Sequence, residues 1–224
     1  HLVEQNYAPA SINAMLSALN SLLDFLGFGD CRVKFLKVQR RMFRNDSRDL
    51  TRSDYNALTA AAKAQNKTRL ALLMEAICAT GIRVSEVQYI TVEAARAGRA
   101  EVALKGKIRT ILIPSKLCRK LLKYAKQQKT ASGEIFLTRN GTPLSRRQIW
   151  AEMKGLCKTA GVAASEVFPH NLRHLFAAAF YRASRDIVKL ADVLGHSSLE
   201  TTRISLLTSG AEHQRQLDRL GLVS

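Results

Sequence analysis

The sequence predicts a mainly α-helical protein with a small antiparallel β-sheet, and two patterns indicate this class. Over most of the 224 residues, apolar side chains recur at i, i+3, i+4 and i+7, the spacing of a helix with one buried face. Residues 100–113 instead alternate in two short runs around Lys-Gly-Lys, which is typical of a β-hairpin. Hydrophobic residues form 46% of the chain, so a packed core is expected.

The first predicted helix covers residues 10–26, where seven apolar side chains form one stripe and Gly27 is placed to end the helix. Residues 31–48 follow, with seven basic residues and one acid. This segment is either an ordinary basic linker or a connector that lies along a phosphate backbone. The second interpretation predicts DNA contacts by Arg32, Lys34, Lys37, Arg40, Arg41 and Arg44.

Three helices are predicted before the hairpin. Thr51 and Asp54 have the spacing of a capping box, which predicts that a helix begins there. A second helix is expected over residues 68–79, with Gly81 as its stop signal. Arg83 then begins a third helix.

The hairpin is predicted to carry Lys105 and Lys107 at its tip. Pro114 and Ser115 end its second strand and begin the next helix. A short third strand is expected at 135–137, followed by a cluster of turn residues.

Helices resume in the last third of the chain. Ser145 is expected to cap one helix that Gly161 ends, and Pro169 is well placed to begin the next. Three further helical segments are predicted, at 185–194, 198–207 and 210–220.

Charge points to a polyanionic partner. The chain has 35 Lys and Arg against 18 Asp and Glu, a formal charge of +17. Such an excess is either a solvated surface or, more often at this size, a footprint for nucleic acid. We expect duplex DNA.

The remaining composition indicates a cytoplasmic protein. The four cysteines form no C-x-x-C pair and are expected to be reduced, buried thiols. No membrane span and no signal peptide is predicted. The chain begins with His1 rather than methionine, as a fragment or processed chain would.

Separate segments carry side chains suited to holding a phosphodiester. Arg83, either a surface charge or part of a site, is followed three residues later by Glu86. His170 and Arg173 are three residues apart, so they lie on one face of the predicted helix. His196 follows Leu-Gly. Two guanidiniums can grip phosphate oxygens in bidentate pairs, and histidines move protons near neutral pH.

A metal site is the competing interpretation. His170 and His174 are four residues apart, as in H-E-x-x-H zinc motifs. Position 171 is asparagine, so the general base of that motif is missing. We therefore expect no metal and no cofactor, and a structural role for His174.

Together these residues resemble the catalytic domain of the tyrosine recombinases, the phage-integrase family. The resemblance covers roughly residues 47–224 and depends on the order arginine, lysine, His-x-x-Arg, Leu-Gly-His. It implies a catalytic domain at 46–224. Residues 1–45 would then be the C-terminal part of a helical core-binding domain with a basic linker.

The resemblance also implies roles for the site residues. Arg83 and Arg173 would clamp the scissile phosphate, and Glu86 would orient Arg83. His170 would transfer a proton or donate a hydrogen bond, and His196 would donate to a phosphate oxygen.

Other basic residues would act around that phosphate. Lys105 would protonate the leaving 5′ oxygen, with Lys107 as the alternative, because boundaries within a short hairpin are uncertain. Further DNA contacts are expected from Lys107, Arg109, Arg146 and Arg147.

The nucleophile is the one departure from the family pattern. Nine residues after His196, where the family carries its tyrosine, this chain has Ser205, and no tyrosine follows. A serine hydroxyl can act as a nucleophile. Its oxygen, however, lies several ångström closer to the backbone, and small misplacements cost large factors in rate. We interpret Ser205 as a substitution, natural or engineered, that disables cleavage.

The resemblance implies a site-specific recombinase or integrase of a mobile element, which joins DNA through a 3′-phosphotyrosine. Its partners would be double-stranded DNA and further copies of itself, as a dimer or a synaptic tetramer. It would act at the nucleoid in the bacterial cytosol. Two alternatives stay open: a DNA-binding regulatory module without catalysis, which Ser205 favours, and a type IB topoisomerase-like enzyme.

Overall fold

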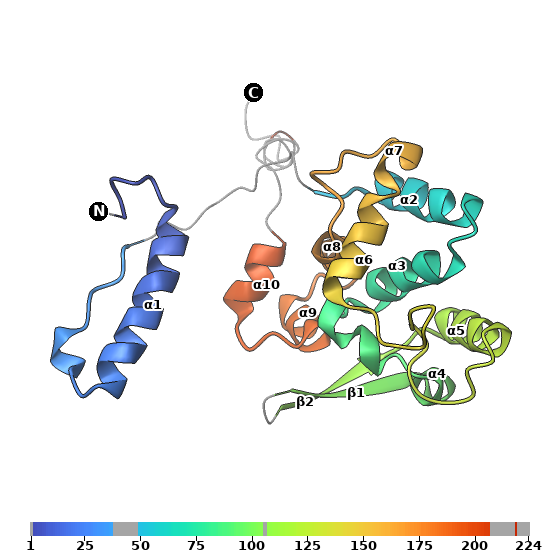
Figure 1. Cartoon of the computed structure of the whole chain (residues 1–224), viewed down its shortest axis with the longest axis horizontal. Coiled ribbons are helices and arrows are strands. Elements are labelled where there is room, and N and C mark those ends of the chain that lie inside the picture. The colour runs from blue at the N-terminus through green and yellow to red at the C-terminus, as the bar shows by residue number, and fades with distance from the viewer. Residues whose placement is uncertain (1, 38–48, 105–106, 207–217, 219–224) are drawn as a thin grey trace. The chain divides into compact units, whose positions relative to one another are not determined.

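The structure, a computed structural model, describes residues 2–37, 49–104, 107–206 and 218. The chain forms two compact units, residues 1–42 and 43–224 (Figure 1). The elements are α1 (Pro9–Phe25), η1 (Gly29–Cys31), α2 (Arg52–Ala64), α3 (Thr68–Thr80), η3 (Val84–Tyr89), α4 (Val92–Ala97), β1 (Arg99–Leu104), β2 (Lys107–Leu112), α5 (Ser115–Gln127), α6 (Arg146–Lys154), α7 (Cys157–Ala160), α8 (Pro169–Ser184), α9 (Ile187–Leu194) and α10 (Leu199–Ser205).

In the first unit, α1 confirms the first predicted helix to within one residue at each end. An extended segment after η1 returns along this helix. The Asn20 amide donates to Val33 O at 2.9 Å and accepts from Val33 N at 2.8 Å. Asn13 holds Leu36 in the same reciprocal way. The two amides thus satisfy backbone groups as a neighbouring strand would.

The apolar stripe of α1 packs little within the described residues. Ile12 is buried, whereas several other members of the stripe are exposed, namely Met15, Leu19, Leu22 and Leu26. One helix and one extended segment offer too little surface to cover such a stripe.

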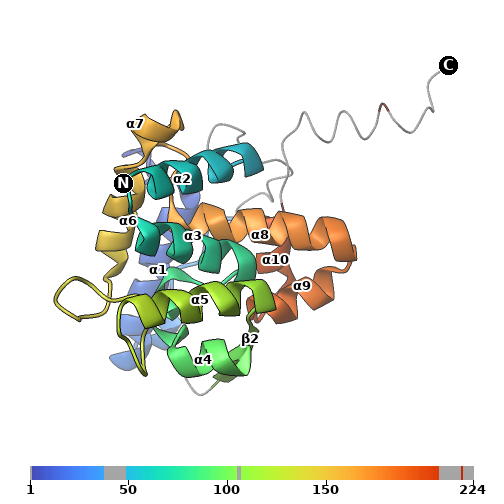
Figure 2. The ribbon, with the colours of Figure 1, turned by 90° about the vertical axis from the view of Figure 1, so that its right-hand side faces the viewer.

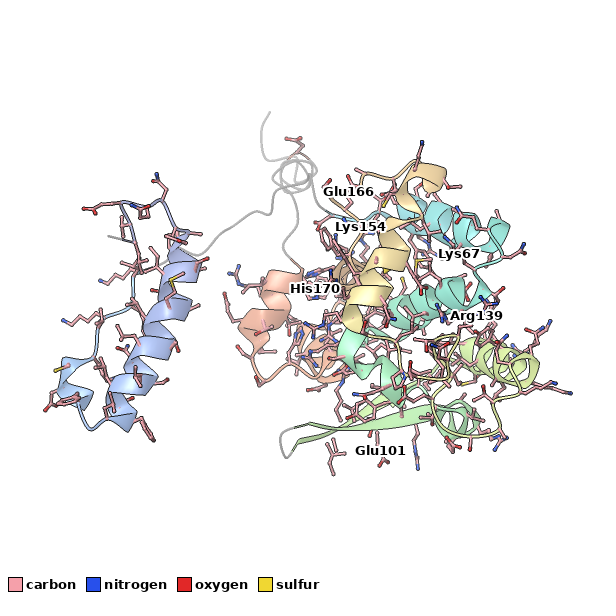
Figure 3. The ribbon with its side chains drawn as sticks, in the orientation of Figure 1. Lys67, Glu101, Arg139, Lys154, Glu166 and His170 are labelled. Atoms are coloured by element: carbon pink, nitrogen blue, oxygen red, sulfur yellow. The ribbon has the colours of Figure 1, made fainter. Side chains whose placement is uncertain are left out.

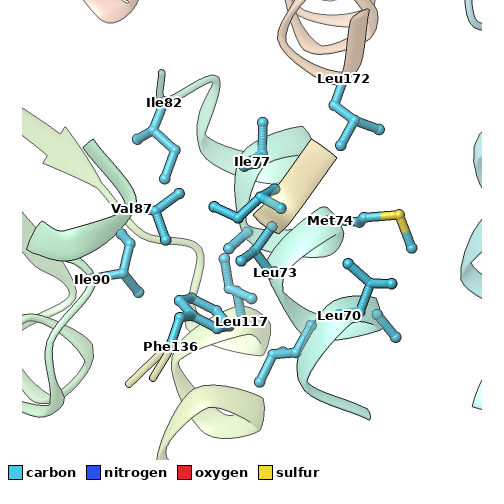
Figure 4. Packing of buried hydrophobic residues seen from close by; sticks show 14 of the residues in the cluster. Leu70, Leu73, Met74, Ile77, Ile82, Val87, Ile90, Leu117, Phe136 and Leu172 are labelled. Atoms are coloured by element: carbon cyan, nitrogen blue, oxygen red, sulfur yellow. The ribbon is translucent and has the colours of Figure 1, made fainter. Parts of the chain in front are cut away.

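The second unit is built around α3, in which eight of thirteen residues are buried. This helix packs against α2, α5 and α8, and its side chains Leu73 and Ile77 lie in the core near Ile82 and Leu172 (Figure 4). From the side, α3, α5 and α4 lie one beside the next (Figure 2). A packed base of this kind gives functional side chains fixed positions.

The predicted hairpin is confirmed. Strands β1 and β2 pair antiparallel with Val102 opposite Arg109, and this is the only sheet among the described residues. Val102 and Ile111 face the core, whereas Ile108 and Leu112 are exposed. Arg109 therefore lies on the inward face of the hairpin, among apolar side chains.

The predicted third strand at 135–137 is wrong. Within the described residues the segment makes isolated bridges only, one of them between Leu137 and Pro143. A turn closes immediately after it, with Thr138 N donating to Thr142 O at 2.7 Å. Proline has no N–H with which to extend a ladder, so pairing ends there.

The predicted helix at Arg83 forms as the 3₁₀ helix η3 rather than as an α-helix. Arg83 N donates to Glu86 Oε2 at 2.8 Å, and Glu86 N donates to Arg83 O at 2.8 Å. This reciprocal closure over three residues tightens the turn. The six-residue helix α4 after it is too short to show a period in the sequence and was not predicted.

The cysteines differ in burial. Cys118 and Cys157 are buried, as predicted, and Cys78 is half-buried. Cys31 is exposed at the end of η1, because the small first unit provides no core around it.

Pro169 begins α8 as predicted, and α9 and α10 pack against the C-terminal part of the unit, close to the predicted ranges. Ser205 is the last residue of α10. Of the helix predicted at 210–220, the structure describes only residue 218. Among the described residues, no helix has the length and apolar character to cross a membrane.

Candidate active site

Gly81 places the first arginine. It ends α3 with φ of 65°, and a Cβ on it would meet the Phe176 ring at 2.4 Å, so both conformation and space require glycine. The chain turns out of α3 there. Arg83 caps η3, lines a pocket together with Pro169 and His170 in the first turn of α8, and donates to Gly195 O in the α9–α10 loop.

Among the described residues that line the two pockets of the site, Glu86 is the only carboxylate. It is 1% exposed and binds two arginines: Arg83 Nη1 donates to Oε1 at 2.9 Å, and Arg109 Nη1 donates to both oxygens at 3.0 and 3.1 Å. The other terminal nitrogen of the Arg83 guanidinium, Nη2, donates to Gly195 O at 3.3 Å. Glu86 thus orients Arg83, as the sequence predicts.

Arg173 is buried on the inner face of α8, only 4% exposed. Its guanidinium donates to two backbone carbonyls, those of Gly81 at 2.5 Å and Leu194 at 2.8 Å. It also lies 2.9 Å from His196 Nε2. These three contacts join α8 to the end of α3 and to the α9–α10 loop.

The partners of His196 define its protonation. A guanidinium can only donate, so Nε2 accepts from Arg173, and Nδ1 must carry the proton that it shares with Thr202 Oγ1 at 2.9 Å. Burial, and then the positive charges of Arg173, Arg83 and Arg109, lower the pKa of His196 to about 4. The ring is therefore neutral at pH 7, and donation to a phosphate would require a second proton or the other tautomer.

Arg83 lies between two pockets. The larger, about 650 Å³, contains His170 and Arg173 together with Arg146, Arg147 and Trp150. The smaller, about 390 Å³, contains Glu86, Arg109 and His196. The pockets bring together residues that are more than a hundred positions apart in the sequence.

His170, labelled in Figure 3, lines the larger pocket together with Trp150 and Phe168. Its ring packs edge-on against His174, with centroids 4.2 Å apart. Lys154 Nζ lies 4.0 Å from the centroid of the Phe168 ring and 5.5 Å from that of Trp150. Among the described residues, no group of three or more His, Cys, Asp and Glu is placed to hold a metal ion.

Positive charge exceeds negative charge at the centre of the site. Three guanidiniums, those of Arg83, Arg109 and Arg173, surround the single carboxylate of Glu86. Burial, together with Arg83 and Arg109, lowers the pKa of Arg173 to about 9. A buried excess of like charge is costly unless an anion joins it, so the arrangement suits a phosphate.

Several predicted site residues are not placed by the structure. Lys105 and three of the predicted linker contacts, Arg40, Arg41 and Arg44, lie outside the described residues. The backbones of Lys107 and Ser205 are described, at the start of β2 and the end of α10.

The other predicted DNA contacts fall into two groups. Arg32, Lys34 and Lys37 are exposed in the first unit, and Arg146 and Arg147 are exposed at the start of α6. Arg109 differs from both groups. Its side chain is 13% exposed and paired with Glu86, which places it inside the site rather than on the surface.

Sequence reasoning missed Thr202 and Trp150. Thr202 is fully buried and holds His196, yet a threonine within a short helix gives no signal of that contact. Trp150 is the single tryptophan of the chain and is 42% exposed beside two arginines. A large exposed aromatic residue among cations is a signal that could have marked this wall.

Comparison with known families gives one match, to the phage integrase family, over residues 48–205. Tyrosine recombinase XerD of Vibrio cholerae is 30% identical over 217 residues, which cover 91% of this chain and 72% of that protein. Tyrosine recombinase XerA of Thermococcus kodakarensis is 30% identical over 225 residues, covering 96% and 77%.

Solved structures share the fold. A crystal structure of XerA recombinase matches with a TM-score of 0.66 and 22% identity, covering 97% of this chain and 78% of that one. The Tn1549 transposon integrase in complex with circular intermediate DNA gives 0.69 and 16%, covering 96% and 80%. A lambda integrase dimer bound to a core site gives 0.68 and 20%, covering 93% and 77%.

Proposed function

The chain belongs to the phage integrase family of tyrosine recombinases, and from this premise we propose that it is built to bind duplex DNA and hold one phosphodiester for strand exchange. The observation that carries the proposal is the excess of guanidinium groups around Glu86, of which those of Arg109 and Arg173 are largely buried. Arg83, Arg173 and His196 come from three separate segments, yet Arg173 bonds to His196 directly and both arginines bond to backbone oxygens just before it, those of Gly195 and Leu194. Such a preorganised cationic centre stabilises the pentacoordinate phosphorus of the transition state.

At the phosphate, Arg83 and Arg173 would donate to the non-bridging oxygens, where negative charge grows as the phosphorus is attacked. His170 would move or donate a proton from the wall of the larger pocket. Lys105 would protonate the departing 5′ oxygen, since an alkoxide is a poor leaving group. Exchange through a phosphotyrosine conserves bond energy, so the proposal needs neither ATP nor a cofactor.

With Ser205 in place of the tyrosine, the protein would bind DNA without cleaving it. At the end of α10 a tyrosine would extend its hydroxyl well beyond the reach of a serine oxygen. A near-attack geometry needs the reacting atoms about 3–3.5 Å apart. We infer that the chain with Ser205 binds its site and does not cleave it.

The first unit would complete the DNA contact. We propose that residues 1–45 belong to a core-binding domain, with Arg32, Lys34 and Lys37 toward the phosphate backbone, as their exposure supports. Further copies would assemble on the same DNA, in keeping with the lambda integrase dimer on its core site. Because its partner is DNA, the protein would act at the nucleoid of the bacterial cytosol.

The test restores the missing hydroxyl. A duplex that the chain selects from a randomised library would be incubated with the Ser205→Tyr variant, and protein–DNA adducts would be sought on denaturing gels. Ser205→Phe is the matched control, because it has the aromatic ring without the nucleophile. We expect an adduct with the tyrosine variant alone. A folded, DNA-binding Ser205→Tyr variant that forms no adduct would contradict the site assignment.

A regulatory module without catalysis is the second candidate, which Ser205 specifically favours. The same experiment separates the two functions. If the other catalytic residues no longer function, the Ser205→Tyr variant would bind DNA but would not cleave it. Should an adduct form, transfer between two differently labelled duplexes would distinguish recombination from topoisomerase-like relaxation.

A further inference from the structure

Arg109 is a charged residue on the buried face of the hairpin. Its neighbours on that face are Val102, directly opposite in β1, and Ile111, and both are buried. An arginine surrounded in this way either pairs or is costly. Its side chain is 13% exposed and lines the smaller pocket together with Glu86 and His196.

The guanidinium of Arg109 joins two segments that are distant in sequence. Nη1 donates to the Glu86 carboxylate in η3, and Nη2 donates to Val193 O, near the end of α9, at 2.8 Å. Arg109 is thus the link between the hairpin, the carboxylate that orients Arg83, and the loop that leads to His196.

Gly195 shows how closely this link is packed. A Cβ on Gly195 would lie 2.3 Å from Arg109 Cδ and 2.9 Å from its Nε, so the arginine occupies the space that a side chain would fill. Gly195 O in turn accepts from Arg83. The loop before His196 therefore packs against the side chain of Arg109 and accepts a hydrogen bond from Arg83.

Stability alone gives a poor reason for an arginine here. Its buried Nε–H has no acceptor among the described residues. A buried ion pair is often replaced by apolar residues without loss of stability, or with a gain. An apolar side chain would suit the inward face of a hairpin, but it could not bind Glu86 and the loop at once.

We propose that Arg109 is a positioning residue for strand cleavage, which sets Arg83, through Glu86, and the His196 loop in register with the hairpin. The proposal rests on the proposed function of the site. Arg109 lies four residues after Lys105 in the sequence, so it ties the strand that follows this lysine to the carboxylate that holds Arg83. Its hydrogen bonds go to the carboxylate of Glu86 and to Val193 O, just before the loop.

Cleavage kinetics test this in the Ser205→Tyr background. Arg109→Gln removes both links, Arg109→Lys keeps a cation for Glu86 but cannot also span to Val193, and Arg99→Gln is the matched control. Arg99 is an exposed arginine in β1 of the same hairpin. We expect single-turnover cleavage to fall by about 10²-fold in Arg109→Gln and less in Arg109→Lys, since misplacement of about 1 Å costs that much.

DNA affinity should separate positioning from binding. It should change by no more than about twofold to threefold in any of these variants, because many cations share the phosphate contacts. Cleavage by Arg109→Gln at the rate of Arg99→Gln would overturn the proposal. A loss of DNA affinity that matched the loss of cleavage rate would show that Arg109 contacts DNA, and it would also overturn the proposal.

A second readout needs no cleavage. The imidazole of His196 is titrated by NMR in the chain that carries Ser205, whose fold is checked by thermal unfolding. Arg109→Gln should raise the pKa of His196, since it removes a positive charge and frees the loop, while Arg99→Gln should leave it unchanged. An unchanged pKa in Arg109→Gln would overturn the proposal. Failure of Ser205→Tyr to form an adduct would count against the proposed function instead, and this titration would still decide on Arg109.

Discussion

Neutralising Glu86 should destabilise the fold through the centre of the site. Glu86→Gln keeps the size of the side chain but removes the charge that binds Arg83 at 2.9 Å and Arg109 at 3.0 Å. Removing one partner of a buried ion pair costs about 3–5 kcal/mol. Because Arg83 is 41% exposed and its attraction is screened by solvent, we expect about 3 kcal/mol, at the lower end of that range.

That loss is readily measured by urea unfolding, followed through the fluorescence of the single tryptophan, Trp150. Domains have about 5–15 kcal/mol of stability in total, so the variant should still fold. In a thermal scan, about 2–4 °C per kcal/mol is expected for a domain of this size, which gives a decrease of about 6–12 °C.

Glu75→Gln is the matched control. Glu75 also pairs with two cations, Lys63 at 3.1 Å and Lys120, but both lysines are largely exposed and the carboxylate is 16% exposed. Exposed pairs contribute about 0–1 kcal/mol. If Glu86→Gln cost no more than Glu75→Gln, Glu86 would not be the counter-charge on which the site depends.

Three further outcomes are expected. DNA affinity should fall by about 10³–10⁵ between roughly 50 and 200 mM salt if about 6–10 phosphates are contacted, and a flat plot of log affinity against log salt would exclude such an interface. In the Ser205→Tyr background, Arg83→Ala and Arg173→Ala should each abolish single-turnover cleavage with little change in DNA binding. The double variant should cleave scarcely more slowly than either single variant. A near-normal cleavage rate in either single variant would remove that arginine from the site. Because burial lowers the pKa of His196 to about 4 from 6.5, the unfolded chain alone takes up this proton as pH falls from 6.5 toward 4. Stability should therefore decline across that window, by about 1–2 kcal/mol after allowance for partial exposure, and urea midpoints of His196→Gln should decline less.

Signals that act between near neighbours predicted much of the fold. The capping box of Thr51 and Asp54, the stop at Gly81 and the start at Pro169 all occur as expected, because their hydrogen bonds and dihedral angles are set within a few residues. The third strand was predicted wrongly because a strand needs a partner. The chain turns after Leu137, and Pro143 has no N–H with which to continue the pairing.

The contacts that organise the site were beyond the sequence. The side chains of the second strand alternate, but with Ile108 and Ile111 on opposite faces the pattern could not show which face is buried, so Arg109 was taken for a surface cation. The contact of His196 with Thr202 likewise depends on how α10 packs. The spacing of residue types predicted which residues belong to the site. Their hydrogen-bond partners could be identified only from the fold.

The most direct test of the central claim is the identity of the residue that becomes attached to DNA. The Ser205→Tyr variant would be trapped on its selected duplex, digested with protease, and the DNA-linked peptide would be sequenced by mass spectrometry. We expect a single linkage, between the side chain at position 205 and a 3′ phosphate, and none in Ser205→Phe. Attachment at a native tyrosine such as Tyr181, or through a 5′ phosphate, would contradict the assignment of the clamp and of position 205.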